Sequence, residues 1–278
     1  MVSKVNFGEF GECVRLSNGD VEVICSLEFG PRILSYRKLD GENVLGLYFG
    51  KEIETELGTF HLAGGHRLWI APENWPKTYV PDSDPVECVE ISENEVEIVQ
   101  PVDELSKCQK RIRIKLGSGT DVEVGHSVTY LGEGSVELSP WALTIMRGGG
   151  QVWIPNEPYG AHGPENLLPN RRWITWPYTD LTDPRFEFSS EGLSVRIEDE
   201  FELPQKIGMM NSLGECEYRL DDVTFVKTYP ANPGVYPDLG SNTEIFSAGS
   251  FVEIETLGEL KTLSNGESVD HVEHWRLN

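Results

Sequence analysis

Alternation of apolar and polar residues with a period of two constrains the fold of this chain more than any other feature. Along residues 121–130, one face would carry Val122, Val124, His126, Val128 and Tyr130. The same alternation recurs in residues 111–116, 193–197, 223–227 and 251–255. Successive side chains of a strand point to opposite faces, so each segment predicts a half-buried strand of an antiparallel sheet.

Turn signals separate these segments, among them Asn18-Gly19, Asp40-Gly41, Glu191-Gly192 and Asn265-Gly266. No stretch predicts a helix of three turns, and single helical turns are expected only near 103–107 and 165–168. Residues 155–184 are rich in proline and aromatic residues and predict long loops, which often carry function. Many short strands without a linker predict one all-β domain over residues 1–278, a sandwich or barrel of antiparallel sheets.

The charge balance excludes several classes of partner. The 278 residues carry 46 acidic and 23 basic side chains, for a net charge of −23. Such a surface repels phosphate backbones and anionic lipid, so we expect no nucleic-acid and no membrane partner. The five cysteines show no CxxC spacing, and no apolar leader or membrane-spanning stretch is visible, so a cytoplasmic protein is expected. No cofactor motif occurs, and the oligomeric state stays open.

The segment 60–75 concentrates groups able to do chemistry. Around the pair Gly64-Gly65, where a sharp bend is expected, it places His66, Arg67, Trp69, Glu73 and Trp75. Aromatic faces beside charged groups suit a sugar pocket. Arg67 could bind hydroxyls or a carboxylate, and His66 could exchange a proton near neutral pH. The alternative is a structural turn in which Arg67 pairs with a nearby carboxylate. His61 and His66 flank the bend without a further ligand, so no metal site is expected.

Three other segments carry candidate groups. On a strand, Glu253 and Glu255 would share one face, suited either to solvent or to general-base work. The proline-rich stretch 229–246 carries Tyr236, Asp238, Asn242 and Glu244, which suit a hydroxyl-rich ligand or merely cap turns. Lys206 and Lys227 lie on expected strands, where lysines are usually solvated. His126 lies on an apolar strand face and is expected to be a core histidine.

These motifs together resemble the galactose mutarotase-like (aldose 1-epimerase) superfamily, and more closely a bacterial branch of it known as a domain of unknown function. The residues that carry the resemblance are 29–34, 64–69, Pro72-Glu73, 206–208, 236–238, 242–244, 251–258 and 273–275. They span nearly the whole chain. The resemblance implies a β-supersandwich with a sugar-binding groove across one face of a large antiparallel sheet.

The resemblance also implies a reaction, and the chain departs from it at the histidines. Mutarotases use a glutamate base and a histidine acid to open and close the sugar ring. Ile254-Glu255-Thr256 resembles the family's base motif, so Glu255 is the candidate base. The two family histidines are replaced by Ala63 and Met146, which cannot transfer protons. Either His66 takes the acid role, or the site binds sugars without interconverting them.

Three hypotheses follow. The leading one is a mutarotase-like protein that binds a monosaccharide or short glycan, with Glu255 as base and His66 as acid. Substrate-binding residues would be Arg67, Trp69, Glu73, Trp75, Lys206, Tyr236, Asn242 and Glu244. The first alternative is a non-catalytic carbohydrate-binding protein. The second is a β-sandwich that binds no ligand, in which these side chains would be scattered rather than clustered.

Overall fold

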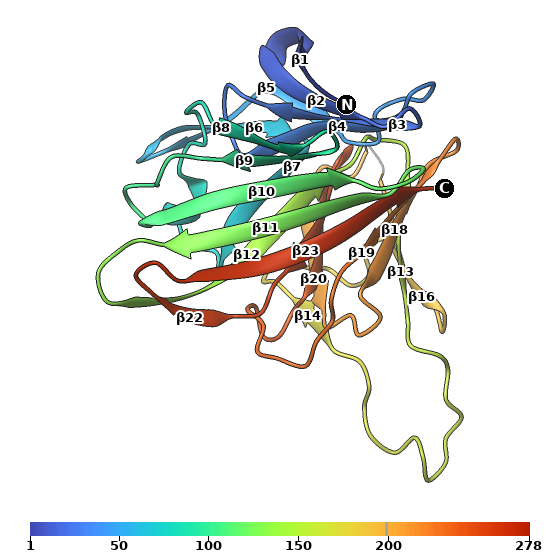
Figure 1. Ribbon diagram of the computed structural model, residues 1–278. Helices are drawn as coiled ribbons and strands as arrows, with labels where there is room; N and C mark the ends of the chain where they lie inside the picture. Colours follow the sequence, from blue (N-terminus) through green and yellow to red (C-terminus); the bar gives the residue numbers. More distant parts are fainter. Residues whose placement is uncertain (198–199) are drawn as a thin grey trace.

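Two large antiparallel sheets form the body of the protein in the computed structural model, which describes residues 1–197 and 200–278 (Figure 1). The first sheet runs in the order β1 (Val2–Asn6), β2 (Glu12–Ser17), β3 (Val21–Ser26), β4 (Arg32–Lys38), β7 (His66–Ala71), β12 (Ser135–Ile145), β21 (Phe251–Leu257), β20 (Thr243–Ala248), β17 (Gln205–Met209) and β14 (Trp173–Thr175), with β22 (Lys261–Ser264) also paired to β12. The second runs β15 (Phe186–Phe188), β16 (Gly192–Arg196), β13 (Gln151–Pro155), β18 (Glu215–Arg219), β19 (Thr224–Thr228), β23 (Ser268–Leu277), β11 (Val122–Tyr130), β10 (Cys108–Leu116), β9 (Glu95–Val99) and β8 (Glu87–Ser92).

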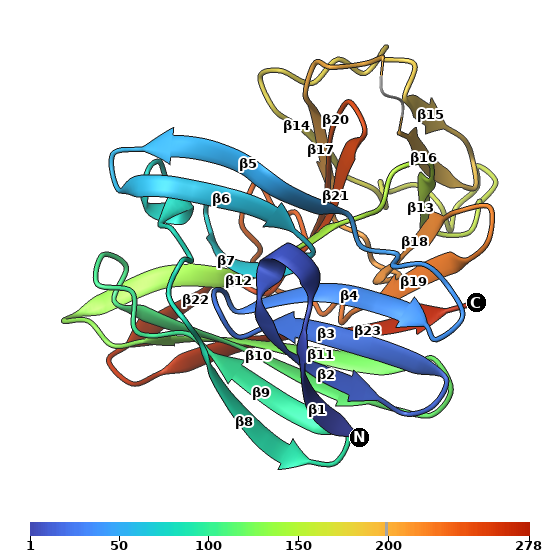
Figure 2. The ribbon, with the colours of Figure 1, turned by 90° about the horizontal axis from the view of Figure 1, so that it is seen from above.

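A separate hairpin, β5 (Leu47–Thr55) and β6 (Gly58–Gly64), extends beside the first sheet (Figure 2). The all-β antiparallel prediction is confirmed, and the five alternating segments all form strands. The loop that follows β13 projects far from the sheets (Figure 1). No helix among the described residues is long and apolar enough to cross a membrane.

The predicted single turn forms at 103–107, where the N–H of Lys107 donates to the carbonyl of Asp103 at 2.8 Å. Among the described residues, two short 3₁₀ helices lie elsewhere, at Gly8–Phe10 and Lys77–Tyr79, and were not predicted. In the turn at 103–107, the carboxylate of Asp103 accepts from the backbone N–H groups of Leu105 and Ser106, at 3.0 and 3.1 Å. These side-chain bonds close a single turn, and Lys107 then leaves the helical region with φ of 55°.

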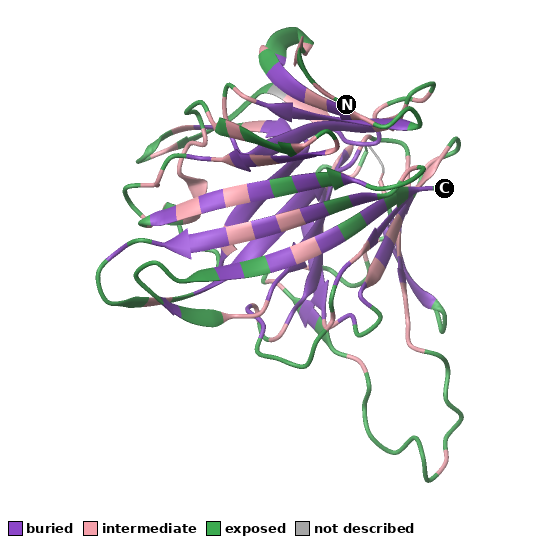
Figure 3. Cartoon of the chain, in the orientation of Figure 1, coloured by how far each residue is buried: buried purple, intermediate pink, exposed green. Residues whose placement is uncertain are grey.

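The core lies between the two sheets. On β11, the alternating face predicted from the sequence is buried, while Glu123 is exposed (Figure 3). The strand β21 differs from the half-buried strand that was expected, because both of its faces are buried. Its inner face meets the second sheet. On the outer face, Phe60 of the hairpin packs with Trp69, Trp141 and Leu257. The candidate site lies on this covered outer face.

The glycine pair makes the predicted bend between β6 and β7. Gly64 and Gly65 have φ of 83° and 73°, which favour glycine. A Cβ on Gly64 would lie 2.2 Å from the carbonyl oxygen of Gly46, and one on Gly65 would lie 2.2 Å from that of Ile33. The bend therefore needs glycine for both its backbone conformation and its close packing, and it delivers the chain into β7.

Candidate functional site

His66 and Glu255 lie on opposite faces of the first sheet. Leu143 of β12 pairs with Arg67 on one side and with Glu255 on the other, so these three side chains share the outer face. Thr144 pairs with His66 and Ile254, which therefore share the inner face. The predicted acid–base pair does not meet across a common groove. Arg67 does share the face of Glu255, and His66 does not.

A charged cluster occupies the outer face where β17, β20 and β21 lie side by side. Glu244 and Glu255 are cross-strand partners, and the Lys206 ammonium contacts both carboxyls, at 2.7 Å and 2.9 Å. Nε1 of Trp141 donates to the same Glu255 oxygen at 2.8 Å. The ammonium also lies over the rings of Trp141 and Trp176, at 4.6 and 4.8 Å. All three charged groups are buried, so the arrangement depends on their mutual neutralisation.

The protonation of this cluster follows from its burial. Burial raises the pKa of Glu244 well above its usual range; the Lys206 ammonium opposes this, while Glu255 and Asp238 add to it. For Lys206, burial lowers the pKa, but Glu255 and Glu244 outweigh it, and the net pKa is raised. The lysine is therefore a fixed cation, and burial favours a proton on Glu244.

A second ion pair lies beside the cluster on the same face. Nη2 of Arg67 donates to Oε1 of Glu253 at 2.9 Å, and the guanidinium stacks 4.1 Å from the ring centroid of Trp69. Burial raises the pKa of Glu253 to about 7; Arg67 opposes this rise and Glu255 adds to it. The pairing matches the structural alternative considered for Arg67. Its Nε and Nη1 atoms nevertheless have no hydrogen-bond partner in the part of the chain described.

A pocket of about 370 Å³ opens above the cluster. Its lining residues are Glu73, Trp75, Tyr79, Trp176, Lys206 and Asp238. Trp75 is 56% exposed, and its ring lies 4.9 Å from that of Tyr79. The Tyr79 hydroxyl in turn donates to Glu73 at 2.5 Å. Aromatic rings thus surround a polar floor, and Lys206 connects the pocket to the buried carboxyls.

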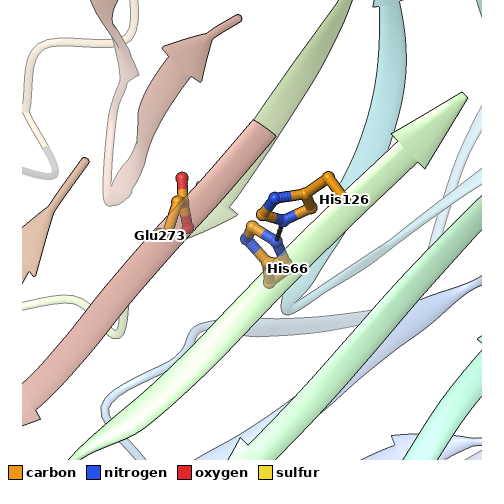
Figure 4. A group of neighbouring side chains, drawn as sticks. All are labelled: His66, His126 and Glu273. Atoms are coloured by element: carbon orange, nitrogen blue, oxygen red, sulfur yellow. Dashed lines mark hydrogen bonds between the residues drawn. The ribbon is translucent and has the colours of Figure 1, made fainter. Parts of the chain in front are cut away.

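On the inner face, His66 belongs to a hydrogen-bonded chain between the sheets (Figure 4). Nδ1 of His126 donates to the carbonyl of His271 at 3.1 Å, so its Nε2 accepts from Nε2 of His66 at 2.7 Å. Nδ1 of His66 then accepts from the hydroxyl of Thr144 at 2.8 Å, which itself accepts from Lys227 at 2.5 Å. Burial lowers the pKa of each histidine, to about 3 for His271. His66 is therefore a neutral core histidine.

The same network contains the one group of possible metal ligands found among the described residues. Ligand atoms of His66, His126 and Glu273 lie within 4.8 Å of one another. However, the two imidazole Nε2 atoms already bond to each other. One Glu273 oxygen contacts Lys227 at 2.9 Å and the other accepts from Trp275 Nε1 at 2.7 Å. Each of these possible ligand atoms already takes part in a hydrogen bond or an ion pair within the protein. The three residues therefore do not fit a metal ion in this arrangement, and we assign them to the core.

Two other predicted binding residues lie away from the pocket. The hydroxyl of Tyr236 donates to the carbonyl of Asn232 at 2.9 Å, and Tyr236 lines a different, larger hollow of about 890 Å³ with Arg111 and Arg113. Asn242 is fully buried, and its amide bonds the backbone of Asn211 through both Oδ1 and Nδ2, at 2.7 and 3.0 Å. Both residues hold loops, as the alternative considered for this stretch proposed.

The remaining predicted binding residues converge. Arg67, Trp69, Glu73, Trp75, Lys206 and Glu244 lie in or around the cluster and pocket. The sequence did not single out Tyr79, Trp141 or Trp176, and it named Asp238 only as a polar loop residue. The available signal was aromatic density: Trp176 lies in the irregular stretch 155–184, whose aromatic residues needed a surface to pack on.

Comparison with solved structures identifies the fold. A galactose mutarotase-like protein from Lactobacillus casei superposes with a TM-score of 0.61 over 96% of this chain and 100% of that one, at 11% identity. Another, from Clostridium acetobutylicum, gives 0.57 over 100% and 98%, at 12% identity. The chain has the galactose mutarotase-like fold. A galactose mutarotase related enzyme from Lactobacillus acidophilus gives 0.54 over 96% and 97%, at 11% identity.

At the level of sequence, no protein-family model matches the chain and no curated protein matches it. The identities to these three solved structures are 11–12%, so the likeness concerns the fold alone. The galactose mutarotase-like fold does agree with the β-supersandwich that the sequence resemblance implied.

Proposed function

We propose that this protein binds a carbohydrate in the pocket formed by Trp75, Tyr79, Trp176, Lys206 and Asp238. The observation that carries the proposal is the pocket's composition: three aromatic rings around a polar floor. The C–H faces of a sugar pack on aromatic rings, and its hydroxyls donate to carboxylates and accept from ammonium groups. The galactose mutarotase-like fold of the chain supports the same ligand class.

Titration of the protein with a panel of aldoses, followed by NMR and calorimetry, tests the proposal. Trp176 lines the pocket, and Trp176→Ala should weaken binding at least about fivefold, because it removes one stacking surface. Trp173→Ala is the matched control, since Trp173 packs on Phe188 outside the pocket, 5.3 Å between centroids. Absence of binding by every aldose, or equal losses in the two variants, would refute the proposed site.

Interconversion of anomers is a second candidate, favoured by the position of Glu255. This carboxyl lies directly behind the pocket, where it contacts Lys206, a pocket-lining residue. Polarimetry of freshly dissolved α-anomers measures the reaction, and Glu255→Gln should abolish any acceleration. Sugar binding without acceleration would leave a non-catalytic carbohydrate-binding protein. His66 is not proposed as the acid, because it lies on the opposite face of the sheet.

A further inference from the structure

The pocket has a larger neighbour along the same segment of chain. This adjoining hollow, of about 700 Å³, is lined in part by the end of β7 and the start of β10. Its lining includes Trp69, Glu73, Thr78, Asp82, Gln100 and Lys110. Glu73 is exposed and also lines the pocket of about 370 Å³, so the two openings lie next to each other at this side chain. The adjoining hollow is about twice as large as the pocket.

A well-defined ridge separates the two openings. The turn before Tyr79 is closed by two hydrogen bonds of 2.8 Å, from the N–H of Thr78 to the carbonyl of Asn74 and from the N–H of Asn74 to the hydroxyl of Thr78. The ring of Tyr79 lies 4.9 Å from that of Trp75 and 5.0 Å from that of Trp69. Trp75 lines the pocket and Trp69 lines the adjoining hollow. A row of three aromatic side chains therefore connects the two openings.

Two buried polar atoms of the adjoining hollow lack partners. Trp69 and Gln100 both line it and are 5% and 7% exposed. Nε1 of Trp69 and Oε1 of Gln100 have no hydrogen-bond partner among the described residues. The indole N–H only donates, and the amide oxygen only accepts. A hydroxyl does both, so a ligand with several hydroxyls can satisfy these two atoms, which are costly to leave unpaired.

The buried charges of the adjoining hollow already neutralise each other. Nζ of Lys110 lies 3.0 Å from Oδ1 of Asp82, and both side chains are buried. Lys107, which also lines the hollow, pairs with Glu104 at 2.5 Å. The two unpartnered atoms are themselves uncharged. A neutral ligand rich in hydroxyls therefore suits this lining better than an ion does.

We infer that the ligand is a neutral oligosaccharide, with its terminal ring in the pocket and the following rings in the adjoining hollow. The inference rests on the proposed function and names the class of sugar. The chain of the oligosaccharide crosses the ridge beside Glu73. There Trp75, which is 56% exposed, offers an aromatic face to a sugar ring. Since the adjoining hollow is about twice the size of the pocket, it accommodates about two further rings.

The test follows affinity with chain length. Calorimetry compares glucose with maltose and maltotriose, glucose with cellobiose and cellotriose, and mannose with mannobiose and mannotriose. In at least one series the trisaccharide should bind about tenfold more tightly than its monosaccharide, because it fills both openings.

A substitution in the adjoining hollow tests the position of the added rings. Gln100→Met removes the unpartnered amide at similar volume, so the variant should fold as well as the wild type in urea denaturation. It should reduce trisaccharide affinity about fivefold, through the loss of one hydrogen bond, and leave monosaccharide affinity unchanged. Gln151→Met is the matched control, because Gln151 lies on β13 and lines neither opening.

The indole N–H signals give a second measurement. In a nitrogen–proton correlation spectrum, the signal of Trp69 should shift with the trisaccharide and not with the monosaccharide. The signal of Trp176, which lines the pocket, should shift with both. The variants Trp69→Phe and Trp176→Phe assign these two signals among the seven tryptophans of the chain.

The outcomes separate this inference from the proposed function. Monosaccharides that bind as tightly as the trisaccharides in every series would overturn the inference and leave carbohydrate binding intact. Full trisaccharide affinity in Gln100→Met, or a Trp69 signal that stays in place when the trisaccharide binds, would refute the assignment to the adjoining hollow. If no sugar of any length binds, the proposed function fails, and the inference fails with it.

Discussion

Removal of the buried ammonium of Lys227 should destabilise the protein strongly. Lys227 and Glu273 are both fully buried between the sheets and lie 2.9 Å apart. The ammonium also donates to the hydroxyl of Thr144 at 2.5 Å and to the carbonyl of Ile254 at 3.3 Å. Lys227→Met keeps much of the side-chain volume but leaves the Glu273 carboxylate without its counter-charge. Breaking a buried pair in this way costs about 3–5 kcal/mol.

That loss is a large fraction of the total free energy of unfolding, which is typically about 5–15 kcal/mol for a domain. Urea denaturation at neutral pH should therefore show a lower midpoint at similar m. In the wild type, burial raises the pKa of Glu273, but Lys227 and the nearby histidines outweigh it and the pKa lies below its usual range. Without Lys227 this carboxyl takes up a proton more readily, so the deficit should shrink as the pH falls.

The double variant Lys227→Met/Glu273→Gln is the control. It removes both charges, and replacing a buried pair by neutral groups is often close to neutral in free energy. It should recover much of the stability lost in the single variant. A single-variant loss below about 1 kcal/mol, or a double variant no more stable than the single one, would refute the view that charge pairing holds this network together.

Three further results are expected. Gly65→Ala should cost more than about 2 kcal/mol in denaturation, because its Cβ would meet the Ile33 carbonyl, whereas Gly119→Ala, at φ of 60° in open space, should cost less. Burial raises the pKa of Glu253 from 4.5 to about 7. The stability that this shift contributes is present below pH 4.5 and is lost as the pH rises to about 7. Glu253→Gln should therefore flatten that part of the curve of unfolding free energy against pH. His66→Gln should lower stability without changing sugar affinity, and reduced affinity at unchanged stability would contradict the face assignment.

The strands were predictable because their signal is local. Alternation within 121–130 and 251–255 identified β11 and β21 and correctly placed Glu253 and Glu255 on one face. The glycine bend was predictable for the same reason, because two adjacent glycines, Gly64 and Gly65, themselves indicate a backbone with positive φ. Burial of both faces of β21 was not, because it depends on a hairpin far away in the sequence that covers the outer face.

The site was predicted only in part because it depends on register. Lys206, Glu244 and Glu255 come from three strands whose pairing no local pattern specifies. Asp238 and Trp176 come from loops that meet only after the sheets have formed. The placement of His66 away from the pocket could have been predicted from local sequence. Residues 66–71 form a strand, and adjacent strand residues such as His66 and Arg67 face opposite sides of a sheet.

The first sheet thus carries polar clusters on both faces, and their hydrogen bonding distinguishes their roles. On the inner face, the donors of Lys227 and His66 each meet an acceptor between the sheets. When the polar groups of a network hydrogen-bond to one another, they are not available to a ligand, and the network stabilises the core. On the outer face, Arg67 Nε, Trp69 Nε1 and both Glu244 carboxyl oxygens lack hydrogen-bond partners among the described residues, and Lys206, which contacts Glu244, lines an open pocket. Unmet polar groups beside an opening are costly unless something binds there, so the outer face is where function should be sought.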